Sequence, residues 1–198
     1  VEHALMANVL ADLAIESEAA TSLAMRVARA VDAAPTQPAE AAFARIATAI
    51  GKFWVCKRVP AFVNEAQECL GGAGYVEESM LPRLYRQAPL NSIWEGSGNV
   101  QCLDVLRALA REPRALQALL DELQQAEGQG GAYDAALEAL RVQLAAGEVA
   151  EADARSLVAR LAVLLQAAVL RKAGSPLAEA FVQSRVARSG GVYGQLPA

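Results

Sequence analysis

Apolar residues recur every three or four positions through most of the chain, and this spacing constrains the fold more than any other feature. Within the first 32 residues they include Leu13, Leu23 and Val27, while Asp12 and Glu16 lie on another face. A period near 3.6 residues places such side chains along one side of an α-helix. Strand-forming runs are scarce, and aromatic residues make up only 5% of the sequence. The sequence therefore predicts an all-α protein.

Prolines and glycines divide this pattern into helices. We expect long helices at 3–32 and 39–70, a third at 97–111, and shorter ones at 113–126, 132–145, 150–173 and 176–188. Pro60 should kink the second helix, and the glycines at 71, 72 and 74 should end it. The segment that follows, up to about residue 91, is expected to be irregular, and residues 189–194 are expected to be loose. The third helix should face the core through Val100, Leu103, Leu106 and Leu109.

These elements predict an up-and-down helical bundle over 1–111 and a helical C-terminal extension over 112–198. The bundle is interpreted as truncated at its N-terminus, and the chain as a fragment of a longer one, because the first residue is not Met. No apolar run approaches the roughly 20 residues that a membrane span needs. Three widely spaced cysteines indicate reduced thiols in a cytoplasmic protein, and the single histidine, His3, offers no metal site.

Positive charge gathers at the C-terminal end. Residues 155–198 contain six Lys or Arg against one Asp or Glu, although the whole chain has a net charge of −4. Such cations could bind nucleic-acid phosphates, or they could form a solvated basic helix face. The six candidates for DNA contact are Arg155, Arg160, Arg171, Lys172, Arg185 and Arg188.

Between the helices, glycines, aromatic residues and charges crowd into residues 69–107. Three motifs follow in order: Leu-Gly-Gly-Ala-Gly-Tyr at 70–75, Leu-Pro-Arg-Leu-Tyr-Arg at 81–86 and Ile-Trp-Glu-Gly-Ser at 93–97. Together they resemble the C-terminal helical domain of the acyl-CoA dehydrogenases, over about residues 1–110. The residues within these motifs are most similar to those of the alkylation-response (AidB-like) branch of that family.

This resemblance implies a tetrameric flavoprotein in which FAD lies between the helical domain and domains that this chain lacks. Glu95 would remove the α-proton of an acyl-CoA thioester while a hydride leaves to FAD. Because those other domains are missing, we expect the isolated chain to be inactive and not to retain FAD. The AidB-like branch also associates with double-stranded DNA, so a DNA-associating protein with a vestigial or protective dehydrogenase site is the alternative function.

Each candidate site residue also has a purely structural interpretation. Glu95 could be a helix N-terminal acid stabilised by backbone dipoles, and Trp94 could be a core side chain instead of a wall of the acyl pocket. Gly71 and Gly72, which resemble a segment that touches the FAD of a neighbouring subunit, could simply cap a helix. Further cofactor contacts are expected from Glu68, through ribose or adenine groups, and from Ser97 and Asn99, for which helix N-capping is the competing role.

Overall fold

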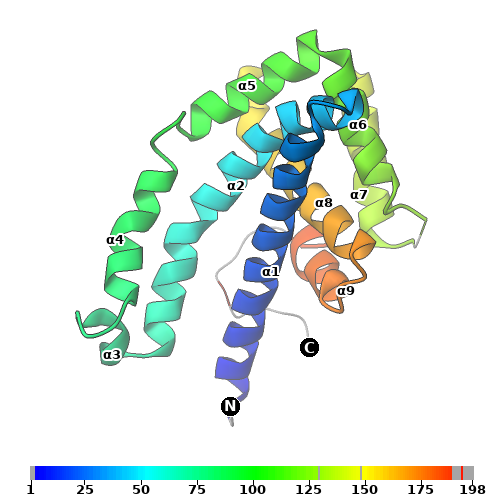
Figure 1. Ribbon diagram of the computed structural model, residues 1–198. Coiled ribbons are helices and arrows are strands. Elements are labelled where there is room, and N and C mark those ends of the chain that lie inside the picture. Colours follow the sequence, from blue (N-terminus) through cyan, green and yellow to red (C-terminus); the bar gives the residue numbers. More distant parts are fainter. Residues whose placement is uncertain (1–2, 129, 148, 189–192, 194–198) are drawn as a thin grey trace.

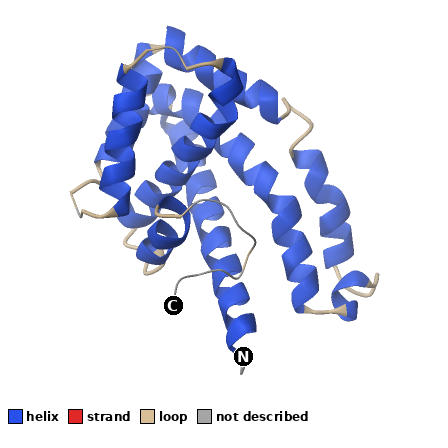
Figure 2. Ribbon diagram, turned by 180° about the vertical axis from the view of Figure 1, so that it is seen from behind, coloured by secondary structure: helices blue, strands red, loops and turns tan. Residues whose placement is uncertain are grey.

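The computed structural model describes residues 3–128, 130–147, 149–188 and 193, and all regular elements among them are helices (Figures 1 and 2). The predicted all-α class is confirmed. The elements are α1 (Ala4–Ala33), α2 (Pro38–Cys69), α3 (Gly72–Tyr75), α4 (Leu81–Asn91), α5 (Gly98–Arg111), α6 (Pro113–Gln124), α7 (Ala132–Ala145), a 3-10 turn η1 (Glu151–Asp153), α8 (Ala154–Lys172), α9 (Ala178–Phe181) and a π-helical turn η2 (Val182–Val186).

Helix α2 is the central element of the fold. It packs against α1, α4, α5, α6 and α8, and Figure 1 shows it running between α1 and α4. Pro38 stands in its first turn, where the missing N–H costs nothing. The helix continues through Pro60 to Cys69, so the proline does not end it.

One hydrophobic core joins helices from both ends of the sequence. Its largest fully buried side chains include Phe43 and Ile50 of α2, Leu119 of α6, Tyr133 of α7 and Phe181 of α9. Helix α8 contributes most densely, because its buried positions cover nearly its whole circumference from Leu161 to Leu170. The segment after residue 111 therefore packs into the same core as the segment before it. The domain boundary at 111/112 stays a prediction.

A buried ion cluster fastens α1 to the C-terminal helices. The Arg26 guanidinium of α1 donates to the Glu122 carboxylate of α6 at 3.0 and 2.9 Å, and Lys172 Nζ of α8 donates to the same carboxylate at 2.7 Å. The Glu122 side chain is only 4% exposed. Burial alone would raise the pKa of Glu122, but hydrogen bonds and charge attraction from Arg26 and Lys172 outweigh it, so that pKa lies below its usual value.

The expectation of an irregular segment up to residue 91 was wrong for its second half, which forms α4. Pro82 stands in the first turn of α4, where proline is well tolerated. The predicted core face of the third helix was wrong for Val100 and Leu103, whereas Leu106 and Leu109 are partly buried against the core. Helix α5 buries Cys102, Val105 and Ala108, whereas Val100 and Leu103 are exposed.

The C-terminal half of α2, with α3 and α4, extends beyond the common core. We call residues 56–91 the arm, because no described residue of this stretch belongs to the main core cluster. The arm exposes large apolar side chains at Leu70, Tyr75, Val76, Met80, Leu84, Tyr85 and Leu90. In the described residues no helix has the length and apolar character needed to cross a membrane.

Candidate functional site

The loop between α4 and α5 places Glu95 in a rare backbone conformation. Its φ is 53°, and Glu95 is the one described non-glycine residue with a positive φ. Left-handed backbone is uncommon for a residue with a side chain, and such strain gathers at functional sites. Gly96 follows with φ 93°. The two residues turn the chain sharply into α5 and leave the Glu95 side chain exposed.

Two side chains hold this loop through its carbonyl groups. Lys52 Nζ of α2 donates to the carbonyl oxygens of Trp94 and Gly96, each at 2.5 Å. Gln101 Nε2 of α5 donates to the carbonyl oxygens of Glu95 at 3.0 Å and of Gly96 at 3.2 Å. Side chains from α2 and α5 thus hold the loop in place, and these contacts keep Glu95 in its strained backbone conformation.

Four of the predicted residues meet around this loop. Trp94 is 54% exposed, which excludes the core role for it within this chain. Ser97 occupies the N-cap of α5 but makes no side-chain cap hydrogen bond, so the capping role expected as an alternative is not filled by its hydroxyl. Asn99 is exposed in the first turn of α5. The first-turn N–H groups of a helix lack intrahelical acceptors, and such a terminus favours anions.

The second predicted group lies at the tip of the arm. Gly71 has φ 58° directly after the C-cap of α2, so it ends that helix as the capping interpretation expected. A Cβ at Gly71 or Gly72 would meet no atom within 4 Å, and both residues are exposed. Gly71 therefore ends α2, and the backbone of Gly71 and Gly72 is also open to solvent.

Gly74 has a packing role instead. A Cβ there would lie 2.4 Å from the carbonyl oxygen of Gln67. The buried Gln67 side chain donates from Nε2 to the carbonyl oxygen of Gly74 at 3.2 Å, whereas Glu68 is exposed and accepts from Asn64 at 2.8 Å. Gln67 thus links the end of α2 to α3 at the tip of the arm, and Glu68 lies on the surface.

The tip is acidic. Burial raises the pKa of the Glu65 carboxyl, and the nearby Glu68 raises it further. Burial likewise raises the pKa of the Cys69 thiol, with Glu65 as the next cause. A negative local potential is unfavourable for a diphosphate close to Glu68, and the contact of Glu68 with ribose or adenine groups stays a prediction.

The two predicted groups are not brought together within one chain. They lie at opposite ends of α4 (Figure 1), a helix of 11 residues and therefore about 16 Å long. Glu95, Trp94, Ser97 and Asn99 form one surface, and Glu68, Gly71 and Gly72 form another.

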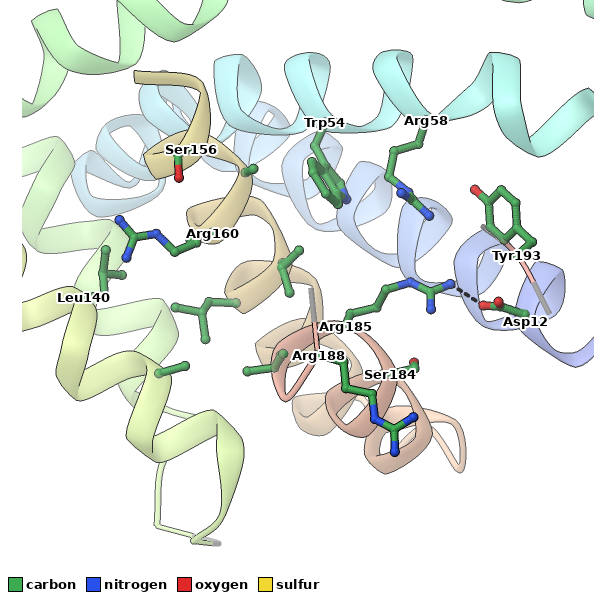
Figure 3. Close-up of a pocket in the computed structure, with 15 residues that line it drawn as sticks. Asp12, Trp54, Arg58, Leu140, Ser156, Arg160, Ser184, Arg185, Arg188 and Tyr193 are labelled. Carbon is green, nitrogen blue, oxygen red and sulfur yellow. Dashed lines mark hydrogen bonds and ion pairs between the residues drawn. The ribbon is translucent and has the colours of Figure 1, made fainter. Parts of the chain in front are cut away.

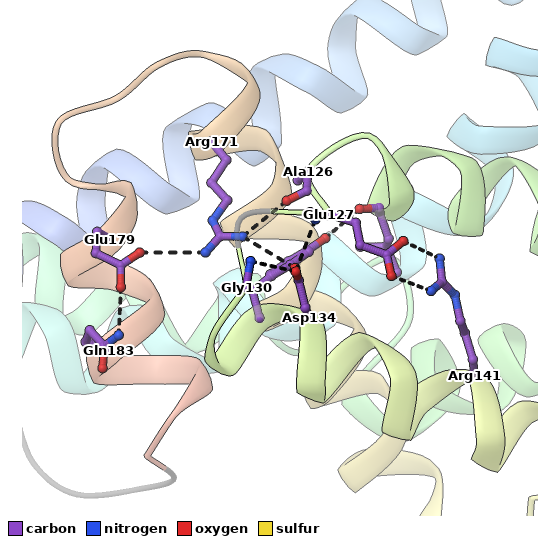
Figure 4. Close-up of polar contacts among 11 residues, drawn as sticks. Ala126, Glu127, Gly130, Asp134, Arg141, Arg171, Glu179 and Gln183 are labelled. Carbon is purple, nitrogen blue, oxygen red and sulfur yellow. Dashed lines mark hydrogen bonds and ion pairs between the residues drawn. The ribbon is translucent and has the colours of Figure 1, made fainter.

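The six predicted DNA-contacting cations are dispersed, and three of them are engaged internally. The Arg171 side chain is 5% exposed, donates to the carbonyl oxygen of Ala126 at 3.1 Å and lies near Asp134 and Glu179 (Figure 4). Lys172 pairs with Glu122, and Arg185 pairs with Asp12 and Glu16. The DNA hypothesis therefore depends on the exposed residues Arg155, Arg160 and Arg188.

Sequence reasoning did not find the residues that hold the site. Lys52, Gln101 and Gln67 act through backbone carbonyl groups, and such contacts leave no spacing pattern in a sequence. In the part of the chain that the structure describes, no group of three or more His, Cys, Asp or Glu residues could hold a metal ion. The three cysteines are unpaired thiols.

Comparison with known proteins gives consistent matches. The family profile described as "Acyl-CoA dehydrogenase, C-terminal domain" matches residues 1–110. The chain is 42% identical over 193 residues to AidB of Escherichia coli (strain K12), which carries a provisional name as an acyl-CoA dehydrogenase; the match covers 97% of this chain and 35% of that protein. It is 33% identical over 124 residues to acyl-CoA dehydrogenase family member 11 of Caenorhabditis elegans, covering 61% of this chain and 20% of that one.

Solved structures agree with these sequence matches. Caenorhabditis elegans ACDH-11, in complex with C11-CoA, superposes with a TM-score of 0.75 at 25% identity and covers 89% of this chain and 35% of its own. The apo form of Bd2924 superposes with a TM-score of 0.75 at 28% identity, covering 87% and 34% respectively. The chain thus spans about a third of the length of these relatives.

Proposed function

This chain belongs to the acyl-CoA dehydrogenase family, as its motifs predicted, and we propose that it forms the helical C-terminal part of a flavin-dependent dehydrogenase acting on an acyl-CoA thioester. The observation that carries the proposal is the loop at 94–96, where a strained glutamate is fixed by Lys52 and Gln101 with its carboxylate outward. A strained and anchored backbone is the arrangement expected of a residue that must meet a substrate in one geometry.

Glu95 removes the α-proton of the thioester. An α-proton beside a carbonyl is weakly acidic, so its removal needs a base that is positioned and shielded from water. Lys52 and Gln101 supply the positioning through three carbonyl groups. The exposed Trp94 ring lies next to Glu95 and narrows the space for the acyl chain. In a longer protein of this family, the other domains would supply the shielding.

The residues present fit FAD, the cofactor of this family, on two observations. Gly71 and Gly72 offer backbone that a flat ring or a ribose can approach without a Cβ in the way. At the start of α5, Ser97 leaves its hydroxyl and the first-turn N–H groups to another acceptor, and Asn99 is exposed beside it. When bound, the cofactor supplies a hydride acceptor near the β-carbon. Ser97 and Asn99 would orient it, and Glu68 would meet its ribose or adenine.

The separation of the two groups supports a homo-oligomer, with a tetramer as the family leads us to expect. The tip of the arm and the Glu95 loop lie at opposite ends of α4, and the family resemblance leads us to expect that Gly71 and Gly72 contact the cofactor of a neighbouring subunit. The apolar side chains exposed on the arm and on α5, such as Leu84, Tyr85 and Leu103, provide the surface for that assembly.

The isolated chain is inactive and does not retain FAD, because it contributes only one wall of the flavin site. No observation favours the alternative of a DNA-associating protein with a vestigial site, since three of its six proposed cations serve internal ion pairs. Glu95 also keeps the anchored geometry that a vestigial site would not need.

The experiment is done in a flavin-loaded protein that contains this chain together with the other domains of its family. Glu95→Gln keeps the size of the side chain and removes the base. We expect acyl-CoA-dependent dye reduction to fall roughly a hundredfold to ten-thousandfold, with flavin content unchanged. The matched control is Glu78→Gln, an exposed acid in the turn before α4, which should retain full activity. Equal turnover in the two variants would refute the role of Glu95.

A further inference from the structure

A cavity lies between α1, α2, α7, α8 and η2 (Figure 3). Its volume is about 450 Å³, within the range of small-molecule sites. None of its lining residues belongs to the loop that carries Glu95 or to the tip of the arm. It is therefore separate from the proposed dehydrogenase site.

Most of the cavity wall is apolar. Trp54 of α2, Leu140 of α7, and Val163 and Leu164 of α8 line it, together with small residues such as Ala159. Leu140 and Leu164 are buried, whereas Trp54 and Val163 are partly exposed. A wall of this kind fits a hydrocarbon or an aromatic body.

The polar part of the lining carries surplus positive charge. Arg58 donates to the Glu16 carboxylate at 2.5 and 2.9 Å, and Arg185 pairs with Asp12 and Glu16, so these two cations are neutralised. Arg160 donates only to the neutral amide oxygen of Gln143. Arg188 is exposed and forms no ion pair with any residue that the structure describes. Arg160 and Arg188 are thus the two cations available to a ligand.

The backbone around Arg185 departs from regular α-helix. Residues 182–186 form a π turn, in which the N–H of Ala187 donates to the carbonyl oxygen of Val182 at 3.0 Å. Such turns are rare and often occur at functional sites. This one brings Ser184, Arg185 and Val186 to the cavity together. In Figure 3 the guanidinium groups of Arg160 and Arg188 point towards different sides of the cavity, whereas Arg185 points towards Asp12.

We propose that this cavity binds a small amphiphilic anion, with its carboxylate or phosphate head at one of the two unpaired lining arginines, Arg160 or Arg188, and its hydrocarbon body against Trp54, Leu140 and Val163. Arginine donates paired hydrogen bonds to either head group. The cations that the sequence suggested as DNA contacts thus differ in role: Arg160 and Arg188 remain open to a small ligand, whereas Arg185 pairs with Asp12 and Glu16 in the cavity wall.

The binding assay uses the fluorescence of Trp54. The chain has two tryptophans, so Trp94→Phe leaves Trp54 as the reporter. The probes are hexanoate, octanoate and decanoate, each below the concentration at which it aggregates. We expect the Kd to fall about fourfold for each added CH2, or about 15-fold from octanoate to decanoate. Decyl phosphate distinguishes the two head groups: tighter binding than decanoate assigns a phosphate ligand, and weaker binding assigns a carboxylate.

Variants separate the head group from the hydrocarbon body. Arg160→Ala combined with Arg188→Ala should weaken decanoate binding tenfold or more and leave 1-decanol binding unchanged. Arg114→Ala, an exposed arginine of α6 outside the cavity, is the matched control and should bind as the parent does. Ala159→Phe fills the cavity from a partly exposed position and should abolish binding of both probes, with the circular dichroism melting curve verifying that the fold is kept.

Three results would overturn the proposal. The first is a Kd that does not depend on chain length. The second is unchanged decanoate binding in the Arg160/Arg188 double variant. The third is salt-sensitive binding of duplex DNA that this double variant loses, in a protein that binds no decanoate, because the two cations would then serve nucleic-acid phosphates.

Discussion

Replacement of Glu122 by Gln tests whether the C-terminal helices and the N-terminal bundle form one cooperative unit. Glu122 joins α6 to Arg26 of α1 and Lys172 of α8, and its side chain is 4% exposed. Removing one partner of a buried ion pair costs about 3–5 kcal/mol. Arg26 keeps its second partner Glu40, and Lys172 is 30% exposed and can be hydrated. We therefore expect a loss of about 2–3 kcal/mol in the free energy of unfolding.

Guanidinium unfolding followed by circular dichroism at pH 7 measures this loss. We expect a single unfolding transition in the parent protein and in Glu122→Gln. The melting temperature should fall by about 5–10 °C. Glu77→Gln is the matched control, since Glu77 forms the same paired contact with Arg86 on the surface, at 71% and 59% side-chain exposure, and should cause no measurable change. Equal stability of the two variants, or a plateau between two transitions, would refute the reasoning.

The stability difference between the parent protein and Glu122→Gln should also depend on pH. The pKa of Glu122 in the folded protein is lowered by Arg26 and Lys172 against the effect of burial, whereas an unfolded Glu has a pKa of about 4.3. Stability from this group is therefore complete above about pH 5 and is lost as the pH falls through the folded pKa. The difference between parent and Glu122→Gln should shrink towards pH 3. A constant difference from pH 7 to pH 3 would contradict this assignment.

Three further predictions follow from local contacts. Lys52→Ala removes two hydrogen bonds to the Glu95 loop, so amide hydrogen exchange at 94–97 should accelerate while the melting temperature changes little. Gly74→Ala places a methyl group 2.4 Å from a carbonyl oxygen and should cost about 1–3 kcal/mol in urea unfolding, whereas Gly72→Ala, with open space around it, should be nearly neutral. The isolated chain should elute without flavin after incubation with FAD, and a yellow, stoichiometric complex would contradict its proposed incompleteness.

Sequence periodicity predicted the long helices well, because each buries one wide apolar stripe. It predicted Ala132–Ala145 with its bounds and α1, α2 and α5 to within a residue or two. It failed for α4, where two prolines and several charges suggested an irregular segment although Pro82 stands where a helix tolerates it. It failed again for half of the face predicted for α5, since Val100 and Leu103 are exposed although Leu106 and Leu109 pack against the core. Periodicity alone does not distinguish a core from a surface that another domain or subunit covers.

The candidate site was predictable only where a motif existed. Trp94, Glu95, Ser97 and Asn99 do lie together, but their anchors Lys52 and Gln101 bind backbone carbonyl groups and leave no motif. For the cations of the C-terminal segment, the sequence suggested a site that the packing does not form. Their density in the sequence suggested one basic surface, yet Arg171 lies buried over the Tyr133 ring at 4.7 Å and Lys172 pairs with Glu122. Composition counts charges, and only packing decides which remain available to a partner.

The central claim is that Glu95 removes the α-proton of an acyl-CoA. Exchange of that proton with deuterium from D2O, followed by proton NMR on a flavin-loaded protein that contains this chain, tests it most directly. We expect exchange in the parent protein and in Glu78→Gln, and at least a hundredfold slower exchange in Glu95→Gln. Exchange at the parent rate in Glu95→Gln, with the acyl-CoA still bound, would contradict the account.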